Sequence, residues 1–156
     1  MQAQEPTMIQ IRRATTDDAK VVGNLVDDLF VELGEGKVSS SDRALLAGSV
    51  LSITDSVFCF LACLQEDVVG VILVNEGIAM FAGGAFGQIT ELYVTPVHRS
   101  AGVAAELLRE VTGLGRARGW CRIDVGAPHQ PNWYRTVAFY KLNGFVEVGP
   151  RLKLVL

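Results

Sequence analysis

Cysteine and histidine are scarce in this chain, which has three cysteines and two histidines among 156 residues. An odd number of cysteines, all in apolar stretches (Cys59, Cys63 and Cys121), does not suit a disulfide framework and indicates reduced core thiols. The cysteines also lack the paired spacing of a zinc site, and His98 and His129 lack the partners of a metal site or a catalytic triad. We therefore expect no metal, and we expect both histidines to be loop residues.

Long hydrophobic runs are also missing. The longest apolar stretches, at about 57–64 and 68–74, are too short to cross a bilayer as helices. Residues 1–8 have neither the positive start nor the apolar centre of a signal peptide, so we expect a disordered tail there. These features predict a soluble, cytoplasmic protein that does not associate with membranes.

The chain has no excess of basic residues. It carries 14 Lys and Arg against 17 Asp and Glu, which gives a net charge of −3. Binding to nucleic acid needs a basic face that neutralises phosphates, so the composition argues against it. With 49% apolar and 20% charged residues, the sequence is expected to form a single globular domain over residues 9–156.

The stretch 88–125 reads as strand, loop, helix and strand. Residues 88–94 are strand-like, the loop at 99–104 has little side-chain bulk, and a helix to about Arg118 precedes a second strand at 121–125. Backbone N–H groups at the start of that helix can approach an anion such as a pyrophosphate, which the helix dipole also favours. On these residues alone, tight packing of a helix on a strand is the simpler explanation.

Two motifs in this half of the chain resemble those of a known family. Arg-Ser-Ala-Gly-Val-Ala at 99–104, after Leu-Tyr-Val-Thr-Pro at 92–96, resembles the acyl-CoA signature of the GNAT superfamily of N-acetyltransferases. Ala-Phe-Tyr-Lys-Leu-Asn-Gly-Phe at 138–145 resembles that family's second motif, a helix that bears a Tyr and is closed by Gly-Phe. The resemblance implies an α/β (α+β) fold with a mixed, mostly antiparallel sheet of about seven strands and about four helices.

The same resemblance implies acetyl-CoA as the acyl donor. The strand at 88–94 would carry a bulge that splays it from the strand of Ile123, and its freed main-chain groups would pair with the pantetheine arm. Asn132 is a weaker cofactor residue, because family members often place an Asn where Trp133 stands. The residues implied to bind the cofactor are Leu92, Tyr93, Val94, Arg99, Ser100, Ala101, Gly102, Val103, Ala104, Ala105 and Asn132.

Glu91 is the candidate general base. It is a lone carboxylate in an apolar strand, where burial raises the pKa of a carboxylate towards the range in which it accepts a proton at neutral pH. An exposed edge residue or a partner for an arginine is the alternative from the residues alone. The resemblance places the family's base here, with Asp124 on the neighbouring strand in reserve.

Tyr140 is the candidate general acid, since the resemblance implies that its hydroxyl protonates the departing thiolate. Its alternative is an amphipathic core tyrosine. A covalent route through Cys121 is the lesser mechanism, because a thiol buried in an apolar strand stays protonated and inert.

The implied reaction is direct transfer of an acetyl group from acetyl-CoA to a primary amine. A small-molecule acceptor is preferred to a peptide or protein amine, and a homodimer is left open. The alternative from another class is a non-catalytic module that senses acyl-CoA and regulates a partner. Glu91 and Tyr140 are the residues that distinguish the two.

The rest of the chain supplies the remaining elements of the fold. Asp27, Asp28 and Glu32 are expected on the solvent side of the first helix. The glycine-punctuated connection at 76–87 is read as a hairpin tip, with a loop beside the acceptor as the alternative. The expected elements are a strand at 9–13, a helix that starts at 15–18 and ends near Gly34, a helix from about 39 to 51, a hairpin of 57–64 with 68–75, a helix ending near Asn143, and strands at 145–148 and 151–156.

Overall fold

A computed structural model describes residues 8–36, 39–127 and 133–156 of the chain. His129, Asn132 and the expected tail before Met8 lie outside these residues. The described chain falls into two compact units, the first ending at Asp124 and the second comprising Val125–Leu156. The single domain expected over 9–156 therefore stays a prediction.

The observed elements follow the expected order closely. Both predicted helix starts carry the expected caps: Thr15 forms a capping box with Asp18, and Ser39 accepts a hydrogen bond from the Asp42 N–H at 3.1 Å. The elements are β1 (Ile9–Arg13), η1 (Thr16–Asp18), α1 (Ala19–Glu32), α2 (Ser40–Leu51), β2 (Val57–Leu64), β3 (Asp67–Ala79), β4 (Gly84–Val94), η2 (Pro96–His98), α3 (Val103–Arg118), β5 (Ile123–Val125) and α4 (Tyr134–Leu142).

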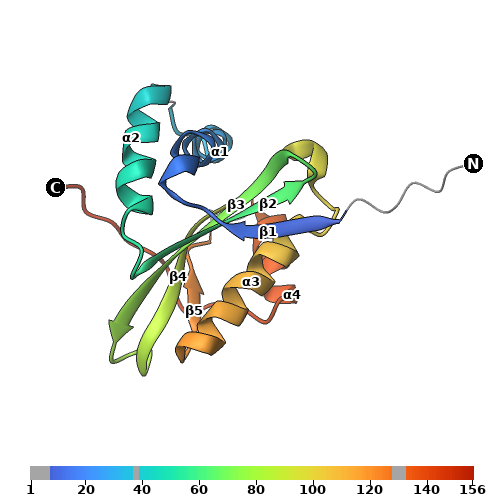
Figure 1. Cartoon of the computed structure of the whole chain (residues 1–156). Coiled ribbons are helices and arrows are strands. Elements are labelled where there is room, and N and C mark those ends of the chain that lie inside the picture. The colour runs from blue at the N-terminus through green and yellow to red at the C-terminus, as the bar shows by residue number, and fades with distance from the viewer. Residues whose placement is uncertain (1–7, 37–38, 128–132) are drawn as a thin grey trace, which may run out of the picture. The chain divides into compact units, whose positions relative to one another are not determined.

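The strands form one sheet in the order β1-β2-β3-β4-β5, and the pairs from β1 to β4 are antiparallel. In the first unit, α1 and α2 cover one face of the sheet and α3 covers the other (Figure 1). Leu61, Val71 and Leu73 pack with α1 and α2, whereas Gly70 lies under α3, where it gives Leu107 room to approach. The mixed α/β class is thus confirmed.

The connection at 76–87 is mostly strand. β3 runs on to Ala79 and β4 begins at Gly84, with these two residues opposite each other. Only residues 80–83 form the turn, so the connection is the tip of a long hairpin, as the preferred interpretation had it.

Two of the expected strands are absent from the described residues. The segments 145–148 and 151–156 have no strand conformation, so the sheet has five strands and not seven. Alternating apolar residues favour a strand only if a neighbouring strand is available for pairing. In the described part of the second unit, no such partner is paired with them, and Val146, Leu152 and Leu154 are exposed.

The second unit contains α4 and its C-terminal stop. Gly144 has a φ of +93° and donates its N–H to the Lys141 carbonyl, while the Phe145 N–H bonds to the Tyr140 carbonyl at 3.1 Å. This is a Schellman motif, and the rings of Tyr140 and Phe145 supply its usual apolar contact at 5.3 Å. The predicted left-handed stop at Gly144 is therefore confirmed.

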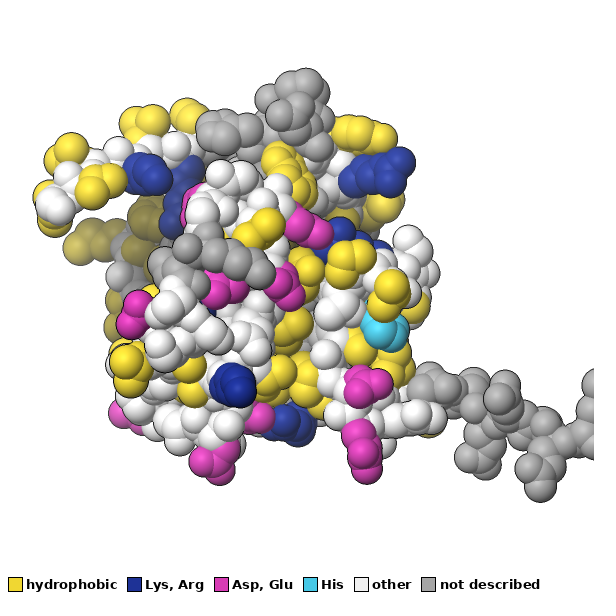
Figure 2. Space-filling model, turned by 90° about the horizontal axis from the view of Figure 1, so that it is seen from above, with side chains coloured by type: hydrophobic (Ala, Val, Ile, Leu, Met, Phe, Trp, Pro, Cys, Tyr) yellow, Lys and Arg dark blue, Asp and Glu magenta, His cyan; other side chains and the backbone are white. Residues whose placement is uncertain are grey.

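The surface carries no extended region of one charge in the view of Figure 2, where Lys and Arg side chains stand apart among acidic and apolar ones. Of the helices within residues 8–36, 39–127 and 133–156, none is long and apolar enough to span a membrane.

Candidate active site

A β-bulge in β4 sets the direction of Glu91. Leu73 on β3 lies opposite Glu91, but the next residue, Val74, lies opposite Ile89, so Thr90 is an extra residue in β4. Because side chains alternate along a strand, one extra residue moves every later side chain to the opposite face. A bulge is thus present in β4, immediately before Glu91, as the resemblance implied, whereas the splay of β4 from the strand of Ile123 stays a prediction.

Glu91 consequently shares a face with the helices α1 and α2. Glu91 lies opposite Leu73, and Leu73 lies opposite Cys59 on the next strand. Burial, followed by the negative charges of Asp18 and Glu91, raises the pKa of the Cys59 thiol to about 12. Glu91 itself is half-buried and accepts a hydrogen bond from the Thr90 hydroxyl. It is therefore a carboxylate with partial access to solvent at the margin of an apolar core.

The chain leaves β4 through a loop with two left-handed residues. Ser100 has a φ of +67° and Gly102 a φ of +83°. Glycine adopts this conformation freely, whereas serine does so at a cost of about 1 kcal/mol or more. Apart from its two chain neighbours, no atom of the described residues lies within 4 Å of the position that a Cβ on Gly102 would occupy. The loop is thus a tightly turned backbone segment with open space in front of it.

The N-terminus of α3 begins at this loop and has no side-chain cap. Gly102 stands at the capping position, where Thr15 caps η1 and Ser39 caps α2, and no side chain of the described residues bonds there. The first N–H groups of any helix lack partners within it and carry a partial positive charge. Ser100, Ala101 and Gly102, which precede these groups, are exposed, and the N–H groups of a helix start are those that an anionic ligand favours.

Arg99 does not extend into that open space. Its Nε donates to the Val94 carbonyl at 2.9 Å, and its guanidinium lies 5.3 Å from the centroid of the Tyr93 ring. Its Nη2 donates to both carboxylate oxygens of Glu32, at 2.7 and 2.9 Å. The arginine of the motif therefore ties the loop to the end of β4 and to the last residue of α1.

The other expected cofactor residues take different environments along this segment. Tyr93 and Val94 are buried, and burial followed by the charge of Glu32 raises the pKa of the Tyr93 hydroxyl. Val103 is buried against the sheet, whereas Leu92, Ala104 and Ala105 are half-buried. The structure thus gathers the residues 92–94 and 99–105 at one end of β4, while Asn132 lies outside the described chain.

Two other candidates have environments that differ from expectation. Asp124 receives two hydrogen bonds of 2.8 Å from Arg122, so both its oxygens already have a partner. Cys121 was expected in an apolar strand, but it is exposed and precedes β5. The reason is that Trp120 takes the interior place, with its ring against Gly87 and Gly115.

Tyr140 is a buried residue of α4 within the second unit. Its ring makes edge contacts with Phe139 and Phe145, at centroid distances of 5.4 and 5.3 Å. Burial raises the pKa of its hydroxyl to about 12. At that pKa the hydroxyl is protonated at neutral pH and can donate a hydrogen bond.

Sequence reasoning missed the partners of the acids on α1. Asp27 was expected on the solvent side, but it is buried and pairs with Arg43 of α2 at 2.8 Å. Glu32 pairs with Arg99, 67 residues later. The density of acidic residues on a helix that packs against other elements was a signal that some of them form ion pairs. The arginines that pair with them could be identified only from the three-dimensional structure. Asp28 remains on the exposed side, as expected.

The described residues were also compared with the ligand sets of metal sites. Within the described ranges, no three His, Cys, Asp or Glu side chains come together as ligands. His98 forms a local hydrogen bond between its Nδ1 and the Thr95 hydroxyl, at 2.7 Å.

Comparison with known proteins gives one family and many related structures. The model of the acetyltransferase (GNAT) family matches residues 25–145. No curated protein matches the chain by sequence. Among solved structures, a predicted acetyltransferase with acetyl-CoA from Clostridium acetobutylicum has a TM-score of 0.78 and 18% identity, over 95% of this chain and 96% of its own.

Two further solved structures have similar scores. Ribosomal-protein-alanine N-acetyltransferase from Brucella melitensis biovar Abortus 2308 has a TM-score of 0.76 and 18% identity, over 96% of this chain and 99% of that one. An aminoglycoside acetyltransferase from an uncultured soil metagenomic sample has a TM-score of 0.74 and 18% identity, over 96% and 99%. The TM-scores establish a common fold, and identities of 18% establish nothing beyond the fold.

Proposed function

Since the chain belongs to the acetyltransferase (GNAT) family, we propose that it transfers an acetyl group from acetyl-CoA to a primary amine by direct attack. One observation carries the proposal beyond family membership. The bulge at Thr90 turns Glu91 away from the α3 face, on the same strand that leads directly into the uncapped start of α3. A base and an anion-binding backbone are thus built from one continuous segment.

The pyrophosphate of the cofactor would bind at the start of α3. The first N–H groups there are donors without intrahelical partners, and the absence of a Cβ at Gly102 leaves room beside the backbone. Acetyl-CoA is the donor that the family uses, and its phosphates are the anion that such a helix start favours. The pantetheine arm would then run along β4 past Leu92 and Val94.

The acyl transfer needs a base and an oxyanion donor. Glu91 takes a proton from the acceptor ammonium or amine, and the amine nitrogen attacks the thioester carbonyl carbon. A main-chain N–H of β4 bonds to the oxyanion that forms. The C–S bond then breaks, and the proton that the attacking nitrogen loses goes to the CoA thiolate, so that the amide and CoA are released.

Tyr140 is the proposed donor to that departing thiolate. A pKa of about 12 keeps its hydroxyl protonated at neutral pH, but it also makes the transfer to a thiolate unfavourable, because thiols have a reference pKa near 8.5. Tyr140 therefore acts mainly as a hydrogen-bond donor to the departing sulfur. We expect its contribution to be smaller than that of Glu91.

The acceptor is proposed to be a small-molecule primary amine. Two related structures carry the names of an aminoglycoside acetyltransferase and of a ribosomal-protein-alanine N-acetyltransferase, which represent the two acceptor classes. Free thiol release should be followed with acetyl-CoA and a panel of polyamines, aminoglycosides, amino acids and a peptide with an N-terminal alanine. Turnover with the peptide alone would reverse the acceptor class, and cofactor binding without any turnover would favour a sensor.

Cofactor binding has its own test. A ligand that binds only the folded state stabilises it by about 2.7 kcal/mol at a hundredfold excess over its dissociation constant. We therefore expect millimolar acetyl-CoA to raise the melting temperature by several degrees. A melting temperature that acetyl-CoA does not move would exclude the proposed function.

Replacement of the base gives the sharpest kinetic test. Glu91→Gln should lower kcat at neutral pH by about 10²- to 10⁴-fold, the usual contribution of a general base, with the affinity for acetyl-CoA nearly unchanged. The loss should become smaller at higher pH, where more of the acceptor is already deprotonated. Glu110→Gln, on the exposed side of α3, is the matched control and should retain kcat. An equal loss at every pH would mean that Glu91 only positions the acceptor.

Tyr140→Phe separates a chemical role from a packing role. We expect kcat to fall on the order of 10- to 100-fold, at the low end for acid catalysis, with the fold intact because only a hydroxyl is removed. Undiminished kcat with a lower melting temperature would assign Tyr140 to the core alone.

A further inference from the structure

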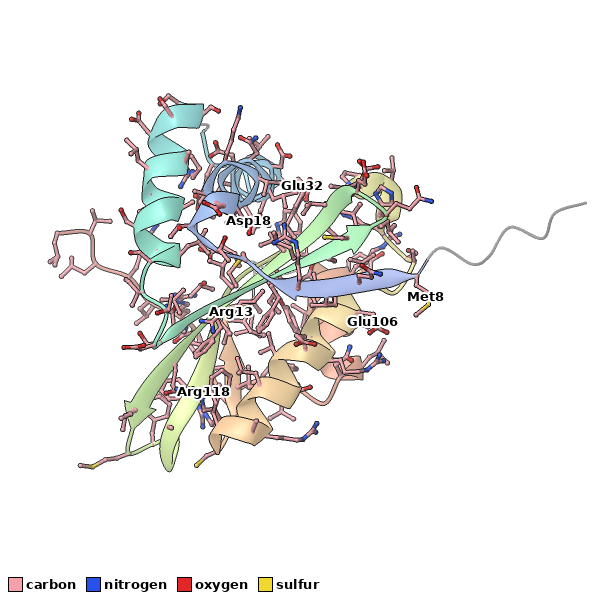
Figure 3. The ribbon with its side chains drawn as sticks, viewed as in Figure 1. Met8, Arg13, Asp18, Glu32, Glu106 and Arg118 are labelled. Carbon is pink, nitrogen blue, oxygen red and sulfur yellow. The ribbon has the colours of Figure 1, made fainter. Side chains whose placement is uncertain are left out.

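Arg99 and Glu32 join two parts of the first unit that are distant in sequence. Glu32 is the last residue of α1, and Figure 3 shows it at the end of that helix. The two hydrogen bonds from Arg99 to its carboxylate are short, at 2.7 and 2.9 Å, although the side chains are 43% and 29% exposed. The pair therefore ties the first residue of the loop motif to a helix that otherwise packs on the sheet.

The loop needs such an anchor because its conformation is not intrinsically favoured. Ser100, the residue after Arg99, is left-handed, and the backbone turns left-handed again at Gly102. A non-glycine residue keeps this conformation only where its surroundings hold it. At the far end, Val103 is buried and fixes the start of α3. At the near end, the fixed point is the Arg99 side chain, through Glu32, Val94 and Tyr93.

We propose that Glu32 is a positioning residue for the acyl donor: through Arg99 it holds the loop 100–102 in the conformation that presents the first N–H groups of α3 to the cofactor pyrophosphate. This inference rests on the proposed function, since it assigns a role within that cofactor site. Glu32 does not touch the ligand in this scheme. Its effect on binding passes entirely through the guanidinium of Arg99.

A positioning role for Glu32 and simple electrostatics predict opposite changes in the affinity for CoA when Glu32 is replaced. Glu32 carries a negative charge close to a loop that would bind a polyanion, so its removal should strengthen binding if charge alone mattered. If Glu32 positions the loop, removal should weaken binding despite the more favourable charge. The direction of the change therefore decides between the two effects.

The test is the affinity of the purified chain for CoA and for pantetheine, by calorimetric titration, together with steady-state kinetics. Glu32→Gln should raise the Kd for CoA and the KM for acetyl-CoA about threefold to tenfold, somewhat above the usual effect of a partly exposed ion pair. The kcat should stay within about twofold, since the chemical step is untouched. Binding of pantetheine, which lacks the phosphates, should not change.

Glu106→Gln is the matched control. Glu106 lies in the first turn of α3, close to the same loop, and its partner within the described ranges is Arg109 on its own helix, at 2.5 Å. Figure 3 labels both acids. The control removes the same charge near the same helix start but leaves the anchor intact, so CoA should bind equally or somewhat more tightly.

Arg99→Lys tests the other half of the pair. Lysine keeps the charge but cannot bond to Glu32 and Val94 through one planar fork. Adding Glu32→Gln to Arg99→Lys should then have little further effect on the Kd for CoA, because the anchor is already lost. Additive effects, or tighter CoA binding by Glu32→Gln, would overturn the inference.

The outcome for the parent chain separates the two proposals. A parent that does not bind CoA contradicts the proposed function itself. A parent that binds CoA while Glu32→Gln binds it unchanged contradicts only the positioning role of Glu32.

Discussion

The two ends of α3 are constructed in opposite ways. At its C-terminus, Gly119 is left-handed, and the Trp120 N–H bonds to the Gly115 carbonyl at 2.8 Å, so the last carbonyls of the helix have partners. Arg118 and the Trp120 indole N–H both donate to Glu76 of β3. At its N-terminus, Gly102 supplies no cap at all.

On the proposed function, the difference divides stability and binding between the two ends of one helix. A terminus whose polar groups are satisfied by the protein contributes to folding and has nothing left for a ligand. A terminus left open forgoes about 1 kcal/mol of capping and keeps its N–H groups for an anion. Substitutions at the two ends should therefore have separable effects on binding and stability.

Closing the open end should give the largest effect. Gly102→Asp places bulk and a negative charge where the pyrophosphate is proposed to bind, so acetyl-CoA affinity should fall about 100-fold or more, equivalent to about 3 kcal/mol. The control is Gly34→Asp, which has the same φ of +83° and equally open surroundings. Both variants should lose similar stability in urea, but only Gly102→Asp should lose binding in a calorimetric titration. Equal binding by both would contradict the anion site.

Disrupting the closed end should cost stability and leave binding intact. A Cβ on Gly115 would lie 2.7 Å from the Trp120 ring, so Gly115→Val should lower the free energy of unfolding by about 2 kcal/mol. Gly113→Val on the same helix has no atom within 4 Å of its new Cβ and should cost little beyond helix propensity. Urea unfolding of both variants measures the difference. A similar loss in both would show that packing at Trp120 is loose.

The smallest effect concerns the acid at the closed end. Hydrogen bonds from Arg118 and then from Trp120 lower the pKa of Glu76 to about 2. A lowered pKa means that this stabilisation is present above the unfolded pKa of about 4.3 and is lost as pH falls towards 2. Because the Arg118 side chain is 39% exposed, Glu76→Gln should cost at most about 1 kcal/mol at pH 7, and nearly nothing at pH 2. A difference independent of pH would mean that the charge of Glu76 is not involved.

Local signals in the sequence were sufficient for most of the fold. Thr15 and Ser39 begin helices, Gly144 ends one, and the hairpin of β2 and β3 has the expected turn. Each of these depends on residues close together in the chain. The signals for the C-terminal strands were of the same kind, but a strand depends on a partner, and alternation in one segment does not provide it.

The bulge at Thr90 could be expected only from the resemblance. No residue type requires it, because Thr suits a regular strand as well as a bulged one. Cys121 illustrates the same limit: its apolar neighbours indicated burial, but Trp120 competes for the interior and is larger. The local sequence indicates which residues favour burial, but which of two neighbouring side chains is buried depends on how the whole core packs.

The ion pair of Glu32 and Arg99 lay beyond sequence reasoning for a different reason. Both residues were identified, one as a surface acid and the other as a motif arginine, but their 67-residue separation carries no information about contact. The candidate cofactor residues at 92–94 and 99–105 are contiguous, so sequence could group them. A long-range pair needs the topology that brings α1 beside the end of β4.

Side chains along β4 alternate between two faces, so the extra residue at Thr90 acts like a shift in a reading frame of two. Deleting Thr90 would remove the bulge, and if Ile89 kept its place opposite Val74, Glu91 would still lie opposite Leu73 on the face of α1 and α2. Keeping Thr90 in a strand without the bulge would instead place Glu91 opposite Ile72 and send it towards α3, with Leu92 and Tyr93 exchanged as well. For this segment, a shift of register matters more than the loss of a residue, much as a shifted reading frame disturbs a message more than the loss of a whole codon does.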